Sequence, residues 1–204
     1  MATPTPAAWN ERFAVADYVF GREPSQFVRN VEPLLARGSR VLCVADGEGR
    51  NSVWLARQGH IVTANDAAPN ALAKARTLAA EAGVTVTFEQ ADLTTWTWPQ
   101  HAFDAVVAVF IQFARSPARE AIFAGLQRCV VPGGLILLHG YTPKQLDYKT
   151  GGPPCAENMY TSDILHHAFA SCRIEQLAEY EADLAEGSGH SGRSALIDLI
   201  ARAP

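Results

Sequence analysis

Apolar runs alternate with segments of helical periodicity along most of the chain. Five runs, at residues 40–45, 61–65, 84–88, 104–110 and 135–139, are rich in Val, Ile, Leu and Ala and are short enough for strands. The segments between these five runs place apolar residues three or four positions apart or carry turn residues. Such alternation predicts an α/β protein with a mostly parallel sheet and helices on both faces.

Pro and Gly mark the ends of the predicted helices. A helix that begins at Pro69 has the residue favoured in a first turn, and Gly83 ends it after Ala82. An amphipathic segment covers Trp9 to Gly21. The other predicted helices begin near Pro24, Asn51, Pro117 and Thr161, and they end near Leu35, Gln58, Arg128 and Ala170.

The C-terminal part breaks this rhythm. Residues 173–181 and 194–201 resemble strands, and only the Gly- and Ser-rich loop 184–192 joins them. Strands joined without a helix are most simply antiparallel neighbours. The prediction is therefore a doubly wound, mostly parallel sheet of seven strands with a C-terminal antiparallel hairpin. We expect a single domain over residues 1–204, with an N-terminal helical segment or lid at 1–38 and the core at 39–204.

Composition narrows the class of partner. The 204 residues are 48% hydrophobic and 19% charged, which is typical of a folded globular domain. No apolar run is long enough for a membrane span, and the first residues lack a leader pattern, so we predict a cytoplasmic protein without a membrane partner. The net charge of −4 argues against nucleic acid. We expect a small-molecule substrate, and the sequence leaves a monomer and a homodimer both open.

The four cysteines give no sign of a metal site or a disulfide framework. None of Cys43, Cys129, Cys155 and Cys172 forms a C-x-x-C pair, and three of them lie in or beside apolar stretches. Buried, inert thiols are the expected reading. Because His166 and His167 are adjacent in sequence, they also match no metal pattern, and we predict no metal.

Residues 41–51, Val-Leu-Cys-Val-Ala-Asp-Gly-Glu-Gly-Arg-Asn, carry the strongest functional signal. A strand stops at the Gly47-Glu48-Gly49 turn and a helix follows at once, which is how a chain presents backbone N–H groups to a ligand. Asp66 ends the next strand, where a carboxylate can accept hydrogen bonds from ribose hydroxyls. This pattern predicts an adenosine-containing ligand.

The turn discriminates between two such ligands. A dinucleotide site requires G-x-G-x-x-G, but Ser52 stands where the third glycine would be. The helix-free hairpin also does not fit the paired halves of a dinucleotide fold. S-adenosylmethionine is therefore favoured as the cofactor, and an NAD-dependent oxidoreductase is retained as an alternative.

Five motifs in order resemble a known family. They are residues 41–51, Asp66 with Pro69-Asn-Ala-Leu72, Ala91-Asp92-Leu93, Phe103-Asp104 and Pro132-Gly-Gly134. From Trp9 to Ala201 the chain resembles class I S-adenosylmethionine-dependent methyltransferases, close to the small bacterial group that includes the tellurite-resistance methyltransferases. The resemblance implies a Rossmann-like fold and a methyltransferase activity.

The resemblance also implies a role for each matching position. Gly47 and Gly49 would let the backbone approach the methionine and ribose, Asp66 would hold the ribose, Asp92 would accept from the adenine amino group, and Leu93 would lie beside the ring. Phe110 would face the methyl-donor end. Ala45 and Ala67 complete the predicted cofactor-binding set.

Two positions depart from the family's first motif. Cys43 replaces an acidic residue that helps to fix the amino-acid end of the cofactor, and Ala45 replaces the first glycine. Either Asp46, or Arg50 with Asn51, is expected to substitute for the missing acid.

Methyl transfer needs alignment more than it needs a general base, because the donor is already activated. The catalytic candidates are His190, in the Gly-rich loop, and Tyr160, in the long loop after the fifth strand. Each has a plain structural alternative: a solvated hairpin loop for His190 and a packed loop anchor for Tyr160. The segment Phe110-Ile-Gln-Phe113 lacks the Asn/Asp-Pro-Pro-aromatic motif of enzymes that methylate base amines.

The predicted function is methyl transfer from S-adenosylmethionine to a small molecule. The resemblance adds a soft sulfur, selenium or tellurium nucleophile as the acceptor to consider. We expect the substrate side to consist of the N-terminal segment, the loop after the fifth strand and the tip of the terminal hairpin. A non-catalytic, S-adenosylmethionine-binding regulatory protein stays open beside the oxidoreductase.

Overall fold

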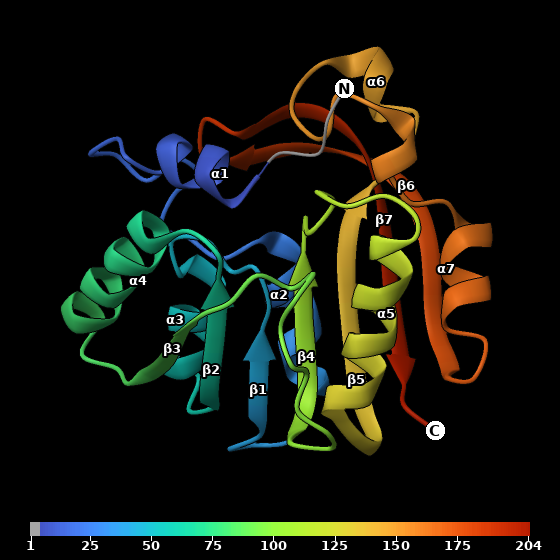
Figure 1. Cartoon of the computed structure of the whole chain (residues 1–204), viewed down its shortest axis with the longest axis horizontal. Coiled ribbons are helices and arrows are strands. Elements are labelled where there is room, and N and C mark those ends of the chain that lie inside the picture. The colour runs from blue at the N-terminus through green and yellow to red at the C-terminus, as the bar shows by residue number, and fades with distance from the viewer. Residues whose placement is uncertain (1–4) are drawn as a thin grey trace.

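A seven-stranded sheet runs through the middle of the computed structural model, which describes residues 5–204 (Figure 1). The strand order is β3-β2-β1-β4-β5-β7-β6. Strands β3 to β5 of this order are parallel, and β7 is antiparallel to both β5 and β6. The strands are β1 (Arg40–Cys43), β2 (Ile61–Asp66), β3 (Val86–Gln90), β4 (Phe103–Val109), β5 (Val130–Tyr141), β6 (Arg173–Glu186) and β7 (His190–Arg202). The predicted fold class is confirmed, including the terminal hairpin.

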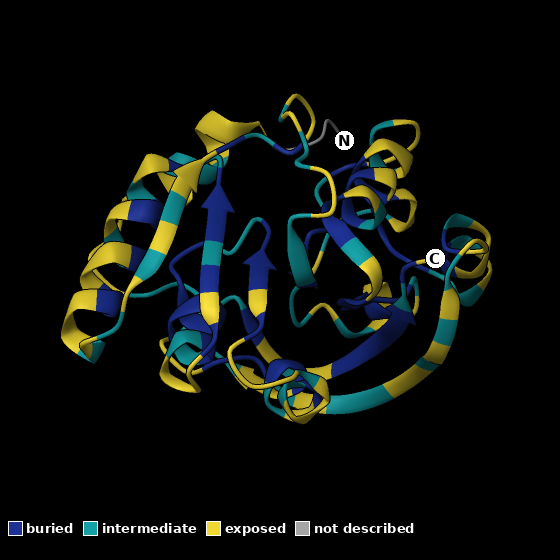
Figure 2. Ribbon diagram, turned by 90° about the horizontal axis from the view of Figure 1, so that it is seen from below, coloured by how far each residue is buried: buried dark blue, intermediate teal, exposed yellow. Residues whose placement is uncertain are grey.

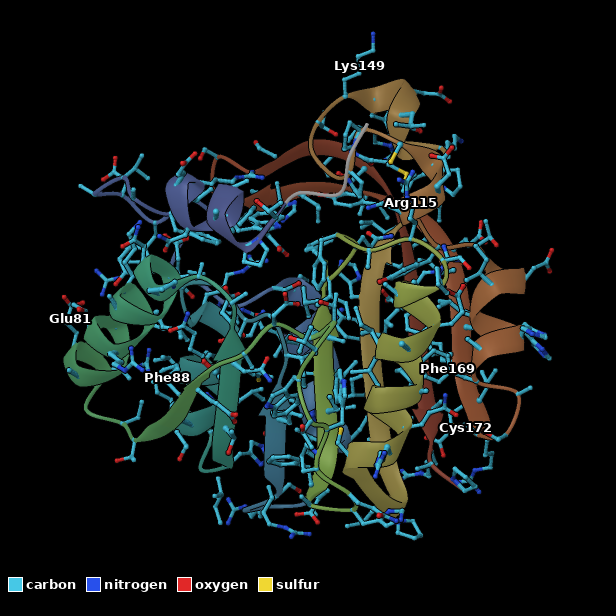
Figure 3. The ribbon with its side chains drawn as sticks, viewed as in Figure 1. Glu81, Phe88, Arg115, Lys149, Phe169 and Cys172 are labelled. Atoms are coloured by element: carbon cyan, nitrogen blue, oxygen red, sulfur yellow. The ribbon has the colours of Figure 1, made fainter. Side chains whose placement is uncertain are left out.

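The helices cover both faces of the sheet. They are α1 (Pro6–Arg12), α2 (Gln26–Val31), α3 (Arg50–Arg57), α4 (Pro69–Ala82), α5 (Ala118–Cys129), α6 (Gln145–Tyr148) and α7 (Ser162–Ala168), with 3₁₀ turns η1 (Glu32–Leu34) and η2 (Ala156–Asn158). Helices α2 and α3 pack on one face through Phe27, Val28 and Leu55. Helices α5 and α7 cover the other face, where Phe123 packs with Phe169, the residue labelled in Figure 3. Within residues 5–204 no helix is long and apolar enough to span a bilayer.

The central strands are buried on both sides, as Figure 2 shows by their dark colour. In β1, the consecutive residues Val41, Leu42 and Cys43 are all almost fully buried. A strand covered on both faces needs apolar residues at every position, because neither side of the pleat reaches water. This explains why the first motif begins with an unbroken apolar run.

The terminal hairpin is longer than the sequence predicts. Most of the predicted loop 184–192 continues the ladder, with Leu184 opposite Gly192 and Glu186 opposite His190. The predicted loop is therefore wrong at its two ends, and a short turn over residues 187–189 replaces it. Glycines usually indicate a loop, but here Gly189 allows the backbone to approach the Phe20 ring closely. A Cβ on Gly189 would lie 2.3 Å from that ring.

The N-terminal segment lies over the carboxyl ends of the parallel strands, beside the curved tip of the hairpin (Figure 1). Helix α1 covers residues 6–12, so only residues 9–12 of the predicted amphipathic segment (9–21) are helical. The rest is held by polar contacts: the Gly189 amide donates to the Val19 carbonyl at 3.2 Å, and the Phe20 amide donates to Glu48 at 3.3 Å. Residues 1–4, the first residues of the predicted N-terminal helical segment or lid (1–38), lie outside the described residues.

Replacing Gly49 with alanine is expected to lower the free energy of unfolding by roughly 2–5 kcal/mol. Gly49 has a φ of +87°, and a Cβ there would lie 2.7 Å from the Ala75 Cβ in α4. Gly59 provides the matched control, because its φ is +94° but nothing lies within 4 Å of the added atom. Gly59→Ala therefore has only the backbone strain, about 1–2 kcal/mol. Urea denaturation measures the free energy of unfolding of both variants. Equal losses of stability in the two would contradict the proposed clash with Ala75.

Candidate active site

A cavity of about 480 Å³ opens at the carboxyl ends of the parallel strands, below α1. This is the usual place for a ligand in an open α/β sheet. Eleven of the predicted site residues line it: Ala45, Asp46, Gly47, Arg50, Asn51, Asp66, Ala67, Asp92, Leu93, Phe110 and His190. They come from the ends of β1 to β4, the start of α3 and the hairpin tip.

The turn after β1 adopts a conformation that suits glycine. Ala45 has a φ of +46° and so occupies the left-handed region. Asn65 holds it there, because its side-chain oxygen accepts from the Ala45 amide at 3.1 Å and its carbonyl accepts from the Asp46 amide at 2.9 Å. The alanine therefore keeps the turn that the family builds with glycine. Cys43 is an ordinary core residue, and burial raises the pKa of its thiol well above the usual value.

Asp66 is fixed at the floor of the cavity. Its carboxylate accepts hydrogen bonds from the Gly47 amide at 2.9 Å and from the Ala68 amide at 2.8 Å. Burial raises its pKa, and these backbone donors partly oppose that rise. Both oxygens keep a lone pair for a further donor. The carboxylate thus joins the turn after β1 to the end of β2.

Asp92, after β3, is oriented by its own loop. One carboxylate oxygen accepts from the Thr94 amide at 2.9 Å and from the Thr94 hydroxyl at 2.7 Å, which forms an Asx turn. None of residues 5–204 hydrogen-bonds to the other oxygen. That oxygen is available to a ligand in the cavity, which Asp92 lines together with Leu93.

A buried ion pair links the helix after the turn to the hairpin. The Arg50 Nη2 lies 2.8 Å from a Glu186 carboxylate oxygen, and both side chains are under 10% exposed. The other carboxylate oxygen accepts from the Gln26 amide at 3.0 Å. Burial raises the pKa of Glu186, but the charge of Arg50 and this amide bring it below its usual value. The Arg50 Nη1 is buried and has no hydrogen-bond partner among residues 5–204.

Asp46 has an unusual protonation equilibrium. Burial raises its pKa to about 7, against the opposing hydrogen bond from the Ser52 hydroxyl. Asp46 thus binds a proton in the folded protein at pH values where the unfolded chain has released it.

This pKa predicts a pH dependence of stability. Between about pH 4 and pH 7 the unfolded state binds fewer protons at Asp46, so stability falls as the pH rises through this range. Asp46→Asn cannot lose a proton and removes this slope. Unfolding free energies from urea titrations at several pH values compare the two proteins, and parallel curves would refute the assignment.

Aromatic rings form the opposite side of the cavity. The His190 ring stacks between Phe110, at 4.1 Å, and Phe20, at 4.6 Å. Its Nδ1 lies 2.5 Å from the Tyr141 hydroxyl. Burial, and then the positive charges of Arg50 and Arg12, hold the pKa of His190 well below its usual value, so the ring is neutral. The alternative of a solvated loop histidine is wrong, because His190 is buried at the start of β7.

Two predicted site residues lie outside the cavity. Tyr160 is 1% exposed, packs on Phe123 and donates to the Ile111 carbonyl at 3.5 Å. Tyr160 therefore contacts the segment after β4 without lining the cavity, as expected for the alternative of a packed loop anchor. Gly49 is turned toward α4. Neither is carried further as a residue that touches a ligand.

The fold brings to the cavity several residues that lie outside the predicted set of site residues, although the N-terminal segment and the region after the fifth strand were expected on the substrate side. Arg12, Phe20, Glu48 and Tyr141 all line it. The aromatic density of residues 9–20 is the signal for the first two, but their direction depends on contacts with a hairpin tip far along the chain. Glu48 lies in the glycine turn itself, where its side chain is buried beside Lys74 at 2.8 Å.

Comparison with known structures identifies this architecture. A protein from a study of the conversion of a disulfide bond into a thioacetal group during echinomycin biosynthesis superposes with a TM-score of 0.81, at 18% identity over 97% of this chain and 92% of that one. TehB from Haemophilus influenzae gives a TM-score of 0.72, at 16% identity over 98% of this chain and 67% of that one. At this identity the likeness concerns the fold. The chain shares this fold with a structure from Methanosarcina mazei that is described as a SAM-dependent methyltransferase, at a TM-score of 0.70 and 17% identity over 89% of this chain and 98% of that one.

Sequence comparison agrees with the fold. Residues 41–134 match the family model of the methyltransferase domain. The chain is 31% identical over 116 residues to a 2-heptyl-1-hydroxyquinolin-4(1H)-one methyltransferase of Mycobacteroides abscessus, a match of 55% of this chain and 50% of that protein. An uncharacterised protein of Mycobacterium tuberculosis is 34% identical over 54% of this chain, which spans 40% of the length of that relative. The predicted resemblance to class I methyltransferases is confirmed.

Proposed function

We propose that this protein transfers a methyl group from S-adenosylmethionine to a small-molecule acceptor. The observation that carries the proposal is the buried, unpartnered Nη1 of Arg50 in a cavity that also holds Asp66 and Asp92 at successive strand ends. A cation and two carboxylates in this order match the amino-acid, ribose and adenine parts of one molecule.

The residues present fit that cofactor. The cavity volume of about 480 Å³ lies within the range of pockets that bind small molecules. Arg50 would hold the carboxylate of the methionine part, Asp66 the ribose hydroxyls and Asp92 the adenine amino group. Gly47 adds no side chain at the point of closest approach. Ala45, Asp46, Asn51, Ala67 and Leu93 complete the cofactor side of the proposal.

When bound, S-adenosylmethionine supplies a methyl group on a positively charged sulfur. The protein's own contribution is alignment and exclusion of water. Phe110 has a φ of +56° and its ring stacks on that of His190, so in this proposal it lies between the cofactor side and the aromatic side. His190 contributes the polar edge that faces an acceptor, with Tyr141 fixing the ring by the hydrogen bond to Nδ1.

Two observations support a small acceptor with a polarisable or aromatic nucleophile. The rings of Phe20, Phe110 and His190 provide flat, apolar contact area. The relative from Mycobacteroides abscessus is named for a hydroxyquinolinone, which is a flat heteroaromatic molecule. A soft sulfur, selenium or tellurium nucleophile, as first expected, suits the same apolar surroundings.

Calorimetric titration with S-adenosylhomocysteine tests the proposal. We expect binding in the micromolar range and no binding of NADH by the same preparation. Failure to bind S-adenosylhomocysteine would refute the proposed function, and binding of NADH would favour the oxidoreductase alternative. Incubation with labelled S-adenosylmethionine and a panel of thiols and aromatic hydroxyls separates an enzyme from a regulatory binding protein, which would form no methylated product.

A further inference from the structure

The two sides of the cavity differ in the charged residues that they contribute, and Glu48 lies where they meet, since it accepts from the Phe20 amide. The acidic side chains that line it, Asp46, Glu48, Asp66 and Asp92, belong to the end of β2 and to the loops after β1 and β3. Within the described residues, the side formed by α1, Phe20, the end of β4 and the hairpin tip has no carboxylate, and its charged group is Arg12. A protein with a net charge of −4 thus presents a cation to whatever lies opposite the cofactor side.

Arg12 is an exposed residue at the edge of the cavity, and two aromatic rings contact its guanidinium. The guanidinium carbon lies 5.1 Å from the centroid of the Trp9 ring and 5.0 Å from that of Phe20. Cation–π contacts at this distance orient the planar group without using its hydrogen-bond donors. Burial lowers its pKa and the charge of Glu48 opposes this, but an arginine stays protonated.

The N–H donors of the Arg12 guanidinium have no acceptor among the described residues. Among residues 5–204, no carboxylate lies within ion-pair distance of its guanidinium, and no acceptor hydrogen-bonds to it. The other arginine among the described residues that line the cavity, Arg50, would be matched, because it pairs with Glu186 and with the proposed carboxylate of the cofactor. A planar, pre-oriented guanidinium with free donors suits an anion in the cavity.

His190 adds a second donor on the same side. Burial raises the pKa of the Tyr141 hydroxyl, so this group keeps its proton and can donate it to the Nδ1 of His190. The neutral imidazole then carries its own proton on Nε2. In this tautomer the ring offers an N–H to the acceptor and does not take a proton from it.

We infer that the acceptor is a planar aromatic or heteroaromatic acid that binds as its anion, and that Arg12 selects this charge. The inference rests on the proposed function and names its substrate class. The ionised atom is the nucleophile itself, such as a thiolate, an aryl oxide or an N-oxide anion of an N-hydroxyl group.

The reaction then needs no base. A lone pair of the anion forms the new bond to the S-methyl carbon, the carbon–sulfur bond breaks, and its electron pair remains on sulfur. A cation and an anion become two neutral products, and no proton moves. Apolar walls favour such a step, since charge disappears as the reaction proceeds.

A binding experiment with a matched pair of inert probes tests the role of Arg12. Quenching of tryptophan fluorescence, to which Trp9 at the cavity contributes, reports binding of 2-naphthoate and of 2-naphthamide in the presence of S-adenosylhomocysteine. We expect the carboxylate to bind about tenfold more tightly than the amide, the Arg12→Met variant to lose this preference, and Arg12→Lys to keep part of it. Arg22→Met is the matched control, because Arg22 lies in the same segment, stacks on Tyr18 and pairs with the exposed Glu81.

Each other outcome has a defined meaning. Equal binding of both probes by the natural protein, or a preference that survives in Arg12→Met, would overturn the inference. Loss of S-adenosylhomocysteine affinity in Arg12→Met, measured by calorimetry, would assign Arg12 to the cofactor and also overturn it. If S-adenosylhomocysteine does not bind the natural protein, the proposed function fails, whereas the probe preference can still be measured without it.

Kinetics test the ionised nucleophile separately. With 4-nitrothiophenol and 4-methoxythiophenol as acceptors, the midpoint of the kcat/KM profile against pH is expected to follow the pKa of each thiol. A midpoint that stays fixed when the thiol is changed would show that a group of the protein takes the proton, and would overturn the inference.

Discussion

Replacing Arg50 with methionine is expected to lower the free energy of unfolding by about 3–5 kcal/mol, the largest effect of any single change considered. The substitution leaves the carboxylate of Glu186 in a site where its side chain is only 9% exposed, with the Gln26 amide as its remaining partner. An isolated buried charge is costly because neither water nor an opposite charge compensates it. Urea denaturation at pH 7 measures the loss.

The double variant Arg50→Met with Glu186→Leu separates stability from binding. Removing both charges is expected to restore most of the stability, since apolar groups of similar size can replace a buried pair. Affinity for S-adenosylhomocysteine should stay low, because the partner of its carboxylate is gone. The control is Arg40→Met: Arg40 pairs with Asp104 at an exposed site, where the pair contributes at most about 1 kcal/mol. Full affinity in the double variant would remove Arg50 from the cofactor site.

The loss of the Arg50 charge also changes the acid stability. Because the folded-state pKa of Glu186 lies below its unfolded value, the pair stabilises the protein above that unfolded value. This contribution disappears as the pH falls through the folded-state pKa. The single variant Arg50→Met should therefore lose less stability on acidification than the natural protein does.

Replacing Asp66 with alanine is expected to weaken S-adenosylhomocysteine binding by about 2–3 kcal/mol, which is roughly a 30- to 150-fold increase in Kd. The substitution removes the proposed acceptor of the ribose hydroxyls. It also frees the Gly47 and Ala68 amides, so the floor of the cavity loses the contact that sets its shape. Calorimetry measures Kd, and circular dichroism verifies that the variant is folded.

Gln90→Ala is the control for Asp66. Gln90 lies opposite Asp66 in the β2–β3 ladder and contacts the Ala67 carbonyl at 3.4 Å. Its loss should leave Kd unchanged, since its side chain does not line the cavity. If Asp66→Ala binds as tightly as the natural protein, the carboxylate has only a structural role in the turn.

Local sequence determined what could be predicted about the fold. The unbroken apolar run at Val41 to Val44, the turn at Gly47 and the Pro and Gly at the ends of α4 act within a few residues, so each predicted its element to within a few positions. The seven strands and the antiparallel hairpin followed from the same signals.

The side-chain contacts on the substrate side of the cavity could not be predicted in the same way, although the segments that form it were expected there. His190 is buried because Phe20 and Phe110, which lie far from it in the sequence, stack on its ring, and no local pattern encodes such contacts. Arg50 was expected at the cofactor, but its pairing with Glu186 depends on how far the hairpin extends. Tyr160 has the composition of a site residue, and the packing of α5 against it decides otherwise.

The carboxylate of Glu48 ties residues 17–20 to the edge of the cavity. It accepts from the Phe20 amide and pairs with Lys74, which also donates to the Asp17 carbonyl at 2.7 Å. Beside it, the Gly189 amide donates to Val19. Residues 17–20 cannot move away from the cavity without breaking these bonds together. The amides of Phe20 and Gly189 should therefore exchange with deuterium at similar rates, as reporters of one cooperative opening event.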